Sequence, residues 1–461
     1  MTLPPAPAQL INLLNDAGFS AFAVGGCVRD SLLGCTPGDW DLCSSATPEQ
    51  AGEILQAAGI AVRETGLQHG TITAAIDHKP YEITSFRRDG VYTDHRRPDS
   101  VQFTTDLHED LARRDFTINA MAFHSQQGII DPFDGQADLR AGVIRCVGEP
   151  AQRFAEDALR ILRALRFAAT LGFSLDEKTA QAAHDLRENL RHIAHERVQV
   201  ELTKLLCGTH ARDILLAHRE IMFTVLPELV LLSGFDQHTP WHCFDVYEHT
   251  CVAVEHVPPT PALRWAALLH DTGKPACFFM RDGTGHAHGH PAVSAEIVLR
   301  VCERLKFSRK LTQQVHALVA NHELRLLDVD MPPAARLKKL LGKFGGDMLL
   351  QLLELNRADV CAQHPDKMYR LENYAPIQQA IEQLIATQSC VTRKQLAVNG
   401  TDLLALGLQD KQLGQVMDVL LEQVIVGALP NEREALLTIA RRCIAHSEAT
   451  YISAQSPNQN E

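Results

Sequence analysis

The hydrophobic pattern of the chain changes near residue 145. Before that point, short apolar runs bounded by turn residues alternate with helical patterns, which is typical of strands mixed with helices. The clearest strand-like runs are 22–26 (FAVGG), Gly70–Ile76, Tyr81–Phe86 and Gly128–Gly135. The sequence therefore predicts a mixed unit of strands and helices over residues 1–145.

After about Cys146 the strand-like runs fade and apolar residues recur at helical spacing, most clearly over Phe154–Phe173. Proline-rich breaks at 258–261 and 332–333 predict loops, and the polar end from Ser447 predicts disorder. We expect an α+β architecture, in which a small head with a mixed sheet is followed by all-helical units. The expected boundaries are 1–145, 146–235, 236–365 and 366–461.

Composition places the chain among ordinary globular proteins. Its 461 residues are 45% hydrophobic and 22% charged. No stretch approaches the ~18 uncharged apolar residues of a membrane span, and the first residues lack a signal-peptide pattern. The 12 cysteines are scattered without a CxxC pair, which is typical of reduced thiols. We therefore expect a cytoplasmic protein with no membrane partner.

The net charge of −12 argues against an indiscriminate nucleic-acid binder. A local exception is Arg300–Lys343, where ten Lys and Arg against four Asp and Glu leave an excess of +6. A solvated helix face explains this excess as readily as an RNA contact does.

A glycine pair follows the first strand-like run. Gly25 and Gly26 predict a strand-to-helix turn, where the backbone can approach a ligand and free N–H groups can face an anion. Arg29, one turn further on, could bind phosphate oxygens as a fork. A plain tight turn with an Arg29–Asp30 surface pair is an equally good interpretation of these residues alone.

Asp39 and Asp41 make the ligand-binding interpretation stronger. Alternate residues of a strand share a face, so two carboxylates would lie together without a basic residue between them. Magnesium, held by one or two carboxylates and by substrate phosphates, is the natural neutralising partner. Two such ions would activate an attacking hydroxyl and stabilise leaving pyrophosphate.

With these residues in place, the chain resembles a known family. Gly-Gly-x-Val-Arg-Asp followed by Asp-x-Asp resembles the DNA polymerase β superfamily of nucleotidyltransferases, and within it the class II tRNA nucleotidyltransferase/poly(A) polymerase branch. Leu111–Ala122 and Glu156–Phe167 resemble two further segments of that branch. The resemblance implies Mg²⁺ at Asp39 and Asp41, with Glu82 as a third carboxylate. It implies nucleotide contacts from Gly26, Arg29, Arg114, Asp157, Arg160, Arg163 and Arg166.

Asp157 and Arg160 predict how a base could be chosen without a template. On one helix they would be neighbours at i and i+3. Cytosine and adenine each present an amino donor beside a ring acceptor, whereas uracil and guanine present the reverse order. A carboxylate only accepts and a guanidinium only donates, so the pair would match C and A alone. A surface ion pair is the alternative.

Such a pocket, with the resemblance, implies a CCA-adding enzyme that acts on tRNA with CTP and ATP. The absence of a long basic C-terminal extension favours this over a poly(A) polymerase. The segment Arg87–Asp99 resembles the flexible loop needed for the switch from C to A, and Ala397–Leu408 with Val424–Glu434 resembles the tail. An enzyme that adds only CC would lack the loop, and one that adds only A stays open.

A second constellation lies in the middle of the chain. His249 and the adjacent His270 and Asp271, within helical patterns, have metal-ligand chemistry. They resemble the HD phosphohydrolase superfamily, which implies Asp359 as the last ligand of a divalent metal. His290 and His322 stand where ligands of a second metal would lie. The resemblance implies phosphatase or phosphodiesterase activity on small phosphates or cyclic nucleotides.

Two readings from other classes stay open. One is an HD phosphohydrolase whose head only senses nucleotides or RNA, and the intact Asp39, Asp41, Arg114, Asp157 and Arg160 speak against it. The other is a non-catalytic RNA-binding protein, which the net charge and two intact metal sites disfavour.

Overall fold

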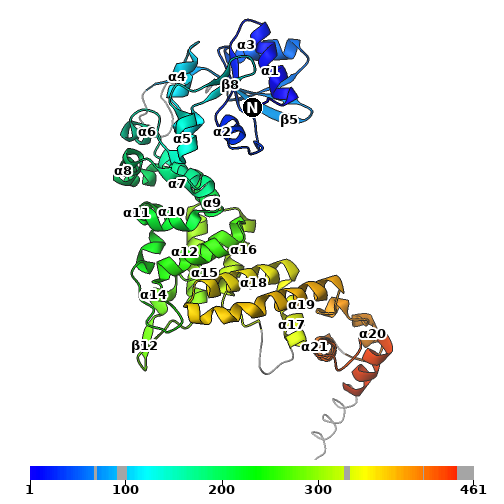
Figure 1. The fold of residues 1–461 in the computed structure, drawn as a ribbon. Helices are drawn as coiled ribbons and strands as arrows, with labels where there is room; N and C mark the ends of the chain where they lie inside the picture. Colours follow the sequence, from blue (N-terminus) through cyan, green and yellow to red (C-terminus); the bar gives the residue numbers. More distant parts are fainter. Residues whose placement is uncertain (67–69, 91–100, 327–332, 409, 444–461) are drawn as a thin grey trace, which may run out of the picture.

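The computed structural model describes residues 1–66, 70–90, 101–326, 333–408 and 410–443. Figure 1 shows an elongated, bent molecule with the sheet-containing head at one end and the C-terminal helices at the other. Most of the proposed flexible loop, Arg87–Asp99, lies outside the described residues.

The head is built on a seven-stranded sheet with strand order β3-β4-β5-β2-β1-β8-β9. The pairs are antiparallel except β2 with β5, which are parallel. The sheet strands are β1 (Ala21–Val24), β2 (Leu42–Ser44), β3 (Ala61–Gly66), β4 (Thr71–Ile76), β5 (Lys79–Ser85), β8 (Ala122–His124) and β9 (Gly128–Ile130), and a separate pair is β6 (Arg87–Asp89) with β7 (Val101–Phe103).

Five helices accompany the sheet, and α1 and α3 pack on each other and on the strands. They are α1 (Pro5–Asp16), α2 (Gly26–Leu32), α3 (Pro48–Ala57), α4 (Leu107–Ala112) and α5 (Gly135–Ala141). Thr47 and Gln50 form a reciprocal capping box that fixes the start of α3. All four residues of β1 are buried, and the chain turns at Gly25 directly after this strand.

The remainder of the chain is mostly helical. Its α-helices include α6 (Pro150–Glu156), α7 (Leu159–Leu171), α8 (Glu177–Asp185), α9 (His195–Leu206), α10 (Ala211–Ala217), α11 (Arg219–Val225), α12 (Val246–His256), α13 (Pro261–Leu269), α14 (Lys274–Cys277), α15 (His290–Arg304), α16 (Arg309–Ala320), α17 (Pro333–Phe344), α18 (Gly346–Cys361), α19 (Tyr374–Ala386), α20 (Gly400–Leu404) and α21 (Asp410–Ile425). The prediction of a mixed head followed by a mostly helical remainder is confirmed.

Two details differ from the expectation. The remainder is not wholly helical, because β11 (Ser174–Leu175) pairs with β10 (Val143–Ile144), and β12 (Phe279–Arg281) forms a hairpin with β13 (Thr284–His286). The predicted helix over Phe154–Phe173 is wrong as a single helix. It is interrupted at Asp157, whose extended backbone (φ −142°, ψ 101°) separates α6 from α7.

One large hydrophobic core runs from the head through the helices to α18. A second cluster joins α17, α18 and α19 around Leu340, Leu349 and Ile377. The tail has its own cluster around Leu403, Leu420 and Leu436. No helix among the described residues is long and apolar enough to cross a membrane.

Candidate functional site

The glycine turn of the head is built to let another chain segment come close. Gly25 has φ +81°, a conformation that favours glycine, and directly precedes α2. A Cβ at Gly25 would lie 3.1 Å from Nη1 of Arg114. The turn therefore brings the start of α2, at Gly26, against the guanidinium of Arg114.

The acidic side chains of the head meet where β2 begins. Asp39 and Asp41 lie in the segment leading into β2, not within a strand as expected. Leu42 pairs with Ile83 in the parallel β2–β5 ladder, which puts Asp41 beside Glu82. Burial, followed by the charges of Asp39 and Glu82, raises the pKa of Asp41 to about 6, although its side chain is still reached by solvent. Arg114 opposes that rise.

Carboxylates that raise one another's pKa form a site that a divalent cation would neutralise, which fits the chemistry expected of Mg²⁺ ligands. Among the described residues, the oxygen atoms of Asp39, Asp41 and Glu82 do not all lie within 4.8 Å of one another. A cation and the phosphates bound with it would have to draw them closer.

The arginines expected at the nucleotide are held by protein partners. Arg29 donates to Asn119 (2.6 Å) and pairs with Asp30. Arg114 pairs with Asp110 at 3.3 Å, Arg163 with Asp115 at 2.6 Å, and Arg166 with Glu201 at 3.1 Å. The Arg29–Asp30 pair was one of the two interpretations of the sequence, whereas Asp110, Asp115 and Glu201 were not found by sequence reasoning.

Three of these guanidinium groups converge on one ring. Arg29, Arg163 and Arg166 lie 4.8, 5.5 and 4.0 Å from the ring centroid of Phe167. Arg29 comes from the head, whereas Arg163 and Arg166 come from α7. The Phe167 ring therefore connects the arginine expected to bind phosphate with the helix expected to select the base.

Asp157 and Arg160 do not pair with each other in the way that one continuous helix would allow. Asp157 lies at the break between α6 and α7 and binds Arg197 of α9, with Oδ2 2.7 Å from Nη2. Arg160 donates to Glu156 at 2.7 Å and to the carbonyl oxygens of Arg153 and Arg113. The expectation that both residues lie on one helix is therefore wrong, because Asp157 lies in the break before α7.

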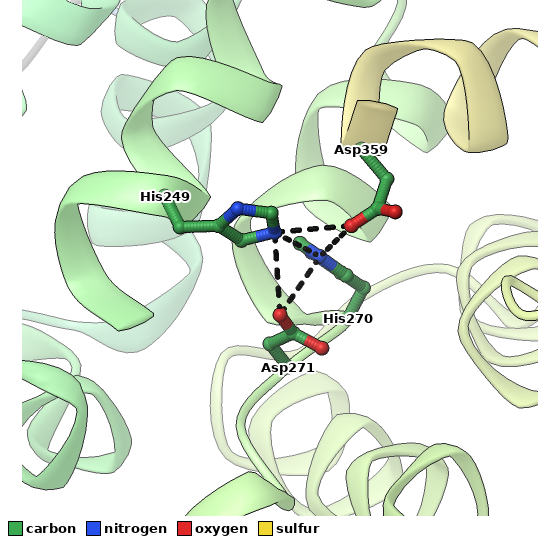
Figure 2. Close-up of side chains that lie close together, drawn as sticks. All are labelled: His249, His270, Asp271 and Asp359. Carbon is green, nitrogen blue, oxygen red and sulfur yellow. Dashed lines mark hydrogen bonds and ion pairs between the residues drawn. The ribbon is translucent and has the colours of Figure 1, made fainter. Parts of the chain in front are cut away.

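A second candidate site lies within the helical part. His249 of α12, His270 at the end of α13, Asp271 and Asp359 of α18 each place one ligand atom within 4.8 Å of the others. Figure 2 shows the four side chains pointing toward one centre, His249 from α12, Asp359 from α18, and the adjacent His270 and Asp271 from the end of α13. Nε2 of His249 lies 3.0 Å from Oδ1 of Asp359, and Nε2 of His270 lies 3.2 Å from Oδ2 of Asp271.

Asp271 also belongs to an adjoining group with His290 and His322. Its Oδ1 lies 3.1 Å from Nε2 of His290 and 3.7 Å from Nε2 of His322, while its Oδ2 faces the first group. The carboxylate thus stands between two sets of ligands, as a bridging ligand would.

The four histidines have the same ring orientation. In each ring, Nδ1 lies 2.8–3.0 Å from a backbone carbonyl oxygen, namely that of Ala362, Ala267, Ala287 and Val319. A carbonyl oxygen only accepts hydrogen bonds, so Nδ1 of each ring carries a proton. The second ring nitrogen, Nε2, then faces the carboxylates and can offer its lone pair to a metal. This fixing of ring and tautomer is typical of metal-ligating histidines.

The electrostatics of the cluster also favour a cation. Burial lowers the pKa of His270, but Asp271 and Asp359 outweigh that effect and raise it to about 10. Burial and the neighbouring His270 lower the pKa of His322 to about 3. Lys274 lies 2.7 Å from Asp271, and Gln363 donates to Asp359 at 3.0 Å. Sequence reasoning missed Gln363 and gave Lys274 no role.

A cavity of about 660 Å³ opens beside this cluster. Its lining includes His242, Lys274 and His290 near the ligands, and Trp241, Tyr369 and Arg370 further out. Lys367 and Arg370 lie 4.4 and 5.6 Å from the Trp241 ring centroid. The cavity can therefore take an anionic molecule that is larger than a phosphate ion.

Three family models match the chain. The model described as "Poly A polymerase head domain" matches residues 21–145, and "Probable RNA and SrmB- binding site of polymerase A" matches 172–232. A model of tRNA nucleotidyltransferase domain 2 matches 292–440. None of these descriptions refers to an HD domain.

Similar proteins and structures give the same picture. The CCA-adding enzyme of Enterococcus faecalis is 33% identical over 439 residues, which is 94% of this chain and 95% of that protein. The CCA-adding enzyme of Leuconostoc mesenteroides is 49% identical over 219 residues, but this match spans only 54% of that protein. A crystal structure of the Bacillus stearothermophilus CCA-adding enzyme in complex with CTP is 28% identical and has a TM-score of 0.71, covering 97% of this chain and all of that one.

Proposed function

Because this chain belongs to the family of CCA-adding enzymes, we propose that it adds C, C and A to the 3′ end of tRNA from CTP and ATP, releasing pyrophosphate. The observation that carries the proposal is the full-length similarity to the Enterococcus faecalis enzyme. The likeness to an enzyme solved with CTP supports the nucleotide, and a Thermotoga maritima CCA-adding enzyme solved with tRNA shares the fold (TM-score 0.55, 19% identity, 95% of each chain).

In the proposed reaction, Asp39, Asp41 and Glu82 hold Mg²⁺, which supplies activation of the tRNA hydroxyl and neutralisation of the pyrophosphate. Arg114 and the start of α2 at Gly26 face the triphosphate. Arg29, held against Asn119, extends that cationic wall. These side chains bind and orient the nucleotide, so that the hydroxyl and the α-phosphate meet in line.

Base choice in this proposal rests on Asp157 and Arg160. The carboxylate accepts the amino group of C or A, and the guanidinium donates to the adjacent ring nitrogen. Uracil and guanine would set acceptor against acceptor, a mismatch that a polar site rejects strongly. Arg163 and Arg166, packed on Phe167, shape the side of the pocket next to this pair.

The test is a 3′-extension assay with Mg²⁺ on tRNAs that end at the discriminator base, at C and at CC. Extension that stops at CCA supports the proposal. Unlimited A addition would identify a poly(A) polymerase, A addition only to the CC-ended tRNA an A-adding enzyme, and extension that stops at CC a CC-adding enzyme. No extension at all would leave the head as a nucleotide sensor.

A second activity is favoured by one specific observation, the shared orientation of four histidines around Asp271. We propose that His249, His270, Asp271 and Asp359 hold a divalent metal, that His290 and His322 with Asp271 hold a second, and that the site hydrolyses phosphate esters. Such metals supply a hydroxide at neutral pH. Lys274, which contacts Asp271 and lines the cavity, would orient the phosphate.

The hydrolysis proposal is tested on the metal-loaded protein with a chromogenic phosphomonoester and with 2′,3′-cyclic and 3′-phosphorylated nucleotides. Release of phosphate that His270→Ala abolishes, with unchanged CCA addition, supports it. Stoichiometric metal binding without hydrolysis of any of these compounds would reduce the cluster to a structural metal site.

A further inference from the structure

The carboxylate of Asp157 is already oriented before a nucleotide arrives. It lies at the interruption between α6 and α7, where its Oδ1 accepts from the backbone N–H of Leu159 at 3.1 Å. Arg197 of α9 grips both oxygens, with Nη2 2.7 Å from Oδ2 and Nη1 3.4 Å from Oδ1. Two contacts from a planar fork fix the plane of a carboxylate, which a single contact would not do.

Arg160 is positioned separately. Its Nη1 donates to Glu156 at 2.7 Å and to the carbonyl oxygen of Arg153 at 3.1 Å, and its Nη2 donates to the carbonyl oxygen of Arg113 at 3.0 Å. The two side chains expected to read the base thus have different supports, Asp157 from α9 and Arg160 from α6 and from Arg113.

The contacts of Asp157 also limit what it can still bind. A carboxylate offers about four acceptor positions, and Arg197 takes two while the Leu159 N–H takes one. One position is left, on Oδ2. A single acceptor in a fixed plane matches the one exocyclic amino group of cytosine or adenine, and it faces the carbonyl oxygen of uracil or guanine unfavourably.

We infer that Arg197 is a specificity-determining positioning residue, which fixes Asp157 so that, together with Arg160, it accepts only a base whose amino group stands beside a ring acceptor, as in cytosine and adenine. This inference rests on the proposed function, because it requires Asp157 to read the base. The side-chain contacts that the structure gives for Arg197 are both with Asp157. It acts on the choice of nucleotide through Asp157.

The experiment compares wild type, Arg197→Met and Arg197→Lys in tRNA extension, with kcat/KM measured for each of the four nucleotides. Arg197→Met keeps the apolar stem but loses the fork. We expect the CTP/UTP and ATP/GTP ratios of kcat/KM to fall by at least about tenfold. Arg197→Lys keeps the charge and not the fork, so its ratios should fall similarly.

Two controls separate this role from a merely structural one. Arg191 forms an exposed ion pair with Glu188 in the same region, and Arg191→Met should change neither the ratios nor the rates. In an Asp157→Ala background, Arg197→Met should cause no further loss of discrimination. Equilibrium binding of CTP and UTP to each variant, without tRNA, gives a readout independent of turnover.

The inference is overturned if Arg197→Met discriminates as wild type does, or if it lowers kcat/KM equally for all four nucleotides. Failure of the proposed function would look different, because the wild-type protein itself would then not build CCA on tRNA.

Discussion

The Nε2 atoms of His290 and His322 lie 3.1 Å apart, while the Nδ1 atom of each ring faces a backbone carbonyl oxygen. Two acceptor nitrogens this close repel each other unless a cation lies between or beside them. With Asp271 next to both, we expect this pair to hold a divalent metal.

The metal content should follow the two groups that share Asp271. We expect two equivalents of a divalent metal in the wild-type protein and about one in His322→Ala, measured by elemental analysis after gel filtration. His316→Ala, within α16 and before the turn that carries His322, is the matched control and should keep both. If His322→Ala binds as much metal as wild type, the adjoining group is not a metal site.

The two proposed activities should be separable by single substitutions. Asp41→Ala is expected to abolish nucleotide addition, because it removes a proposed Mg²⁺ ligand, and to leave phosphate release unchanged. His270→Ala should do the reverse. Both activities are measured on each purified variant, with its circular dichroism spectrum checked. A folded single variant that has lost both would contradict two independent sites.

Base discrimination should depend on the charge of Asp157. Asp157→Asn has nearly the same shape but offers an N–H₂ group beside its oxygen, so it can turn a donor toward uracil or guanine. We expect a clear rise of UTP and GTP misincorporation relative to CTP and ATP, read from single-turnover extension. Unaltered fidelity would remove Asp157 from base selection.

The buried pair between Asp115 and Arg163 should stabilise the protein in a pH-dependent way. Burial raises the pKa of Asp115, but Arg163, Asn119 and Arg160 outweigh it and lower the pKa to about 2. A carboxyl whose pKa is lower in the folded than in the unfolded protein stabilises the fold at pH values above its unfolded pKa, which is near 4. This stabilisation is lost as the pH falls toward 2.

Asp115→Asn should therefore lower the free energy of unfolding by about 2 kcal/mol at pH 7. The difference from wild type should shrink as the pH falls below about 4. Urea titrations between pH 3 and pH 8 measure it, with the exposed Asp185→Asn as the control. A difference that grows toward acid would have the wrong sign for this pair.

We expect a basic surface for tRNA within Arg300–Lys343, and the structure shows which of its residues can test this expectation. Lys339 is engaged with Glu422 of α21 at 2.6 Å, and Arg304 with Glu228, so reversing their charges would disturb packing. Arg309 and Lys310, exposed at the start of α16, are better probes.

Reversing the charges of Arg309 and Lys310 to Glu should weaken tRNA binding and flatten its salt dependence. Filter binding at several salt concentrations measures both effects. The same change at Lys79, the exposed first residue of β5, is the control. Unchanged affinity and salt slope would place the tRNA surface elsewhere.

The order of the chain's units could be predicted because hydrophobic periodicity changes sharply near residue 145. The interruption at Asp157 could not, since neither glycine nor proline marks it and the helical period continues into α7. The hairpin of β12 and β13 was missed because its first strand is exposed at all three positions and shows no alternation.

His249, His270 and Asp271 could be named from their residue types and spacing, and the resemblance to HD phosphohydrolases implied Asp359 as a further ligand. Their supports could not. The carbonyl oxygen that fixes His249 belongs to Ala362, and any residue could supply it. Arg197 was missed for a similar reason, since one arginine on a helix has no local signal and gains its role only where α9 meets α7.

His249 and Asp359 are separated by 110 positions in the sequence, yet a single ion bound by both would cross-link them. Such an ion would close the long loop between these two residues. Its binding free energy would add to the free energy of packing α18 against α12. Metal starvation should therefore loosen this half of the molecule before the head. During synthesis, this metal site could form only after residue 359 has left the ribosome.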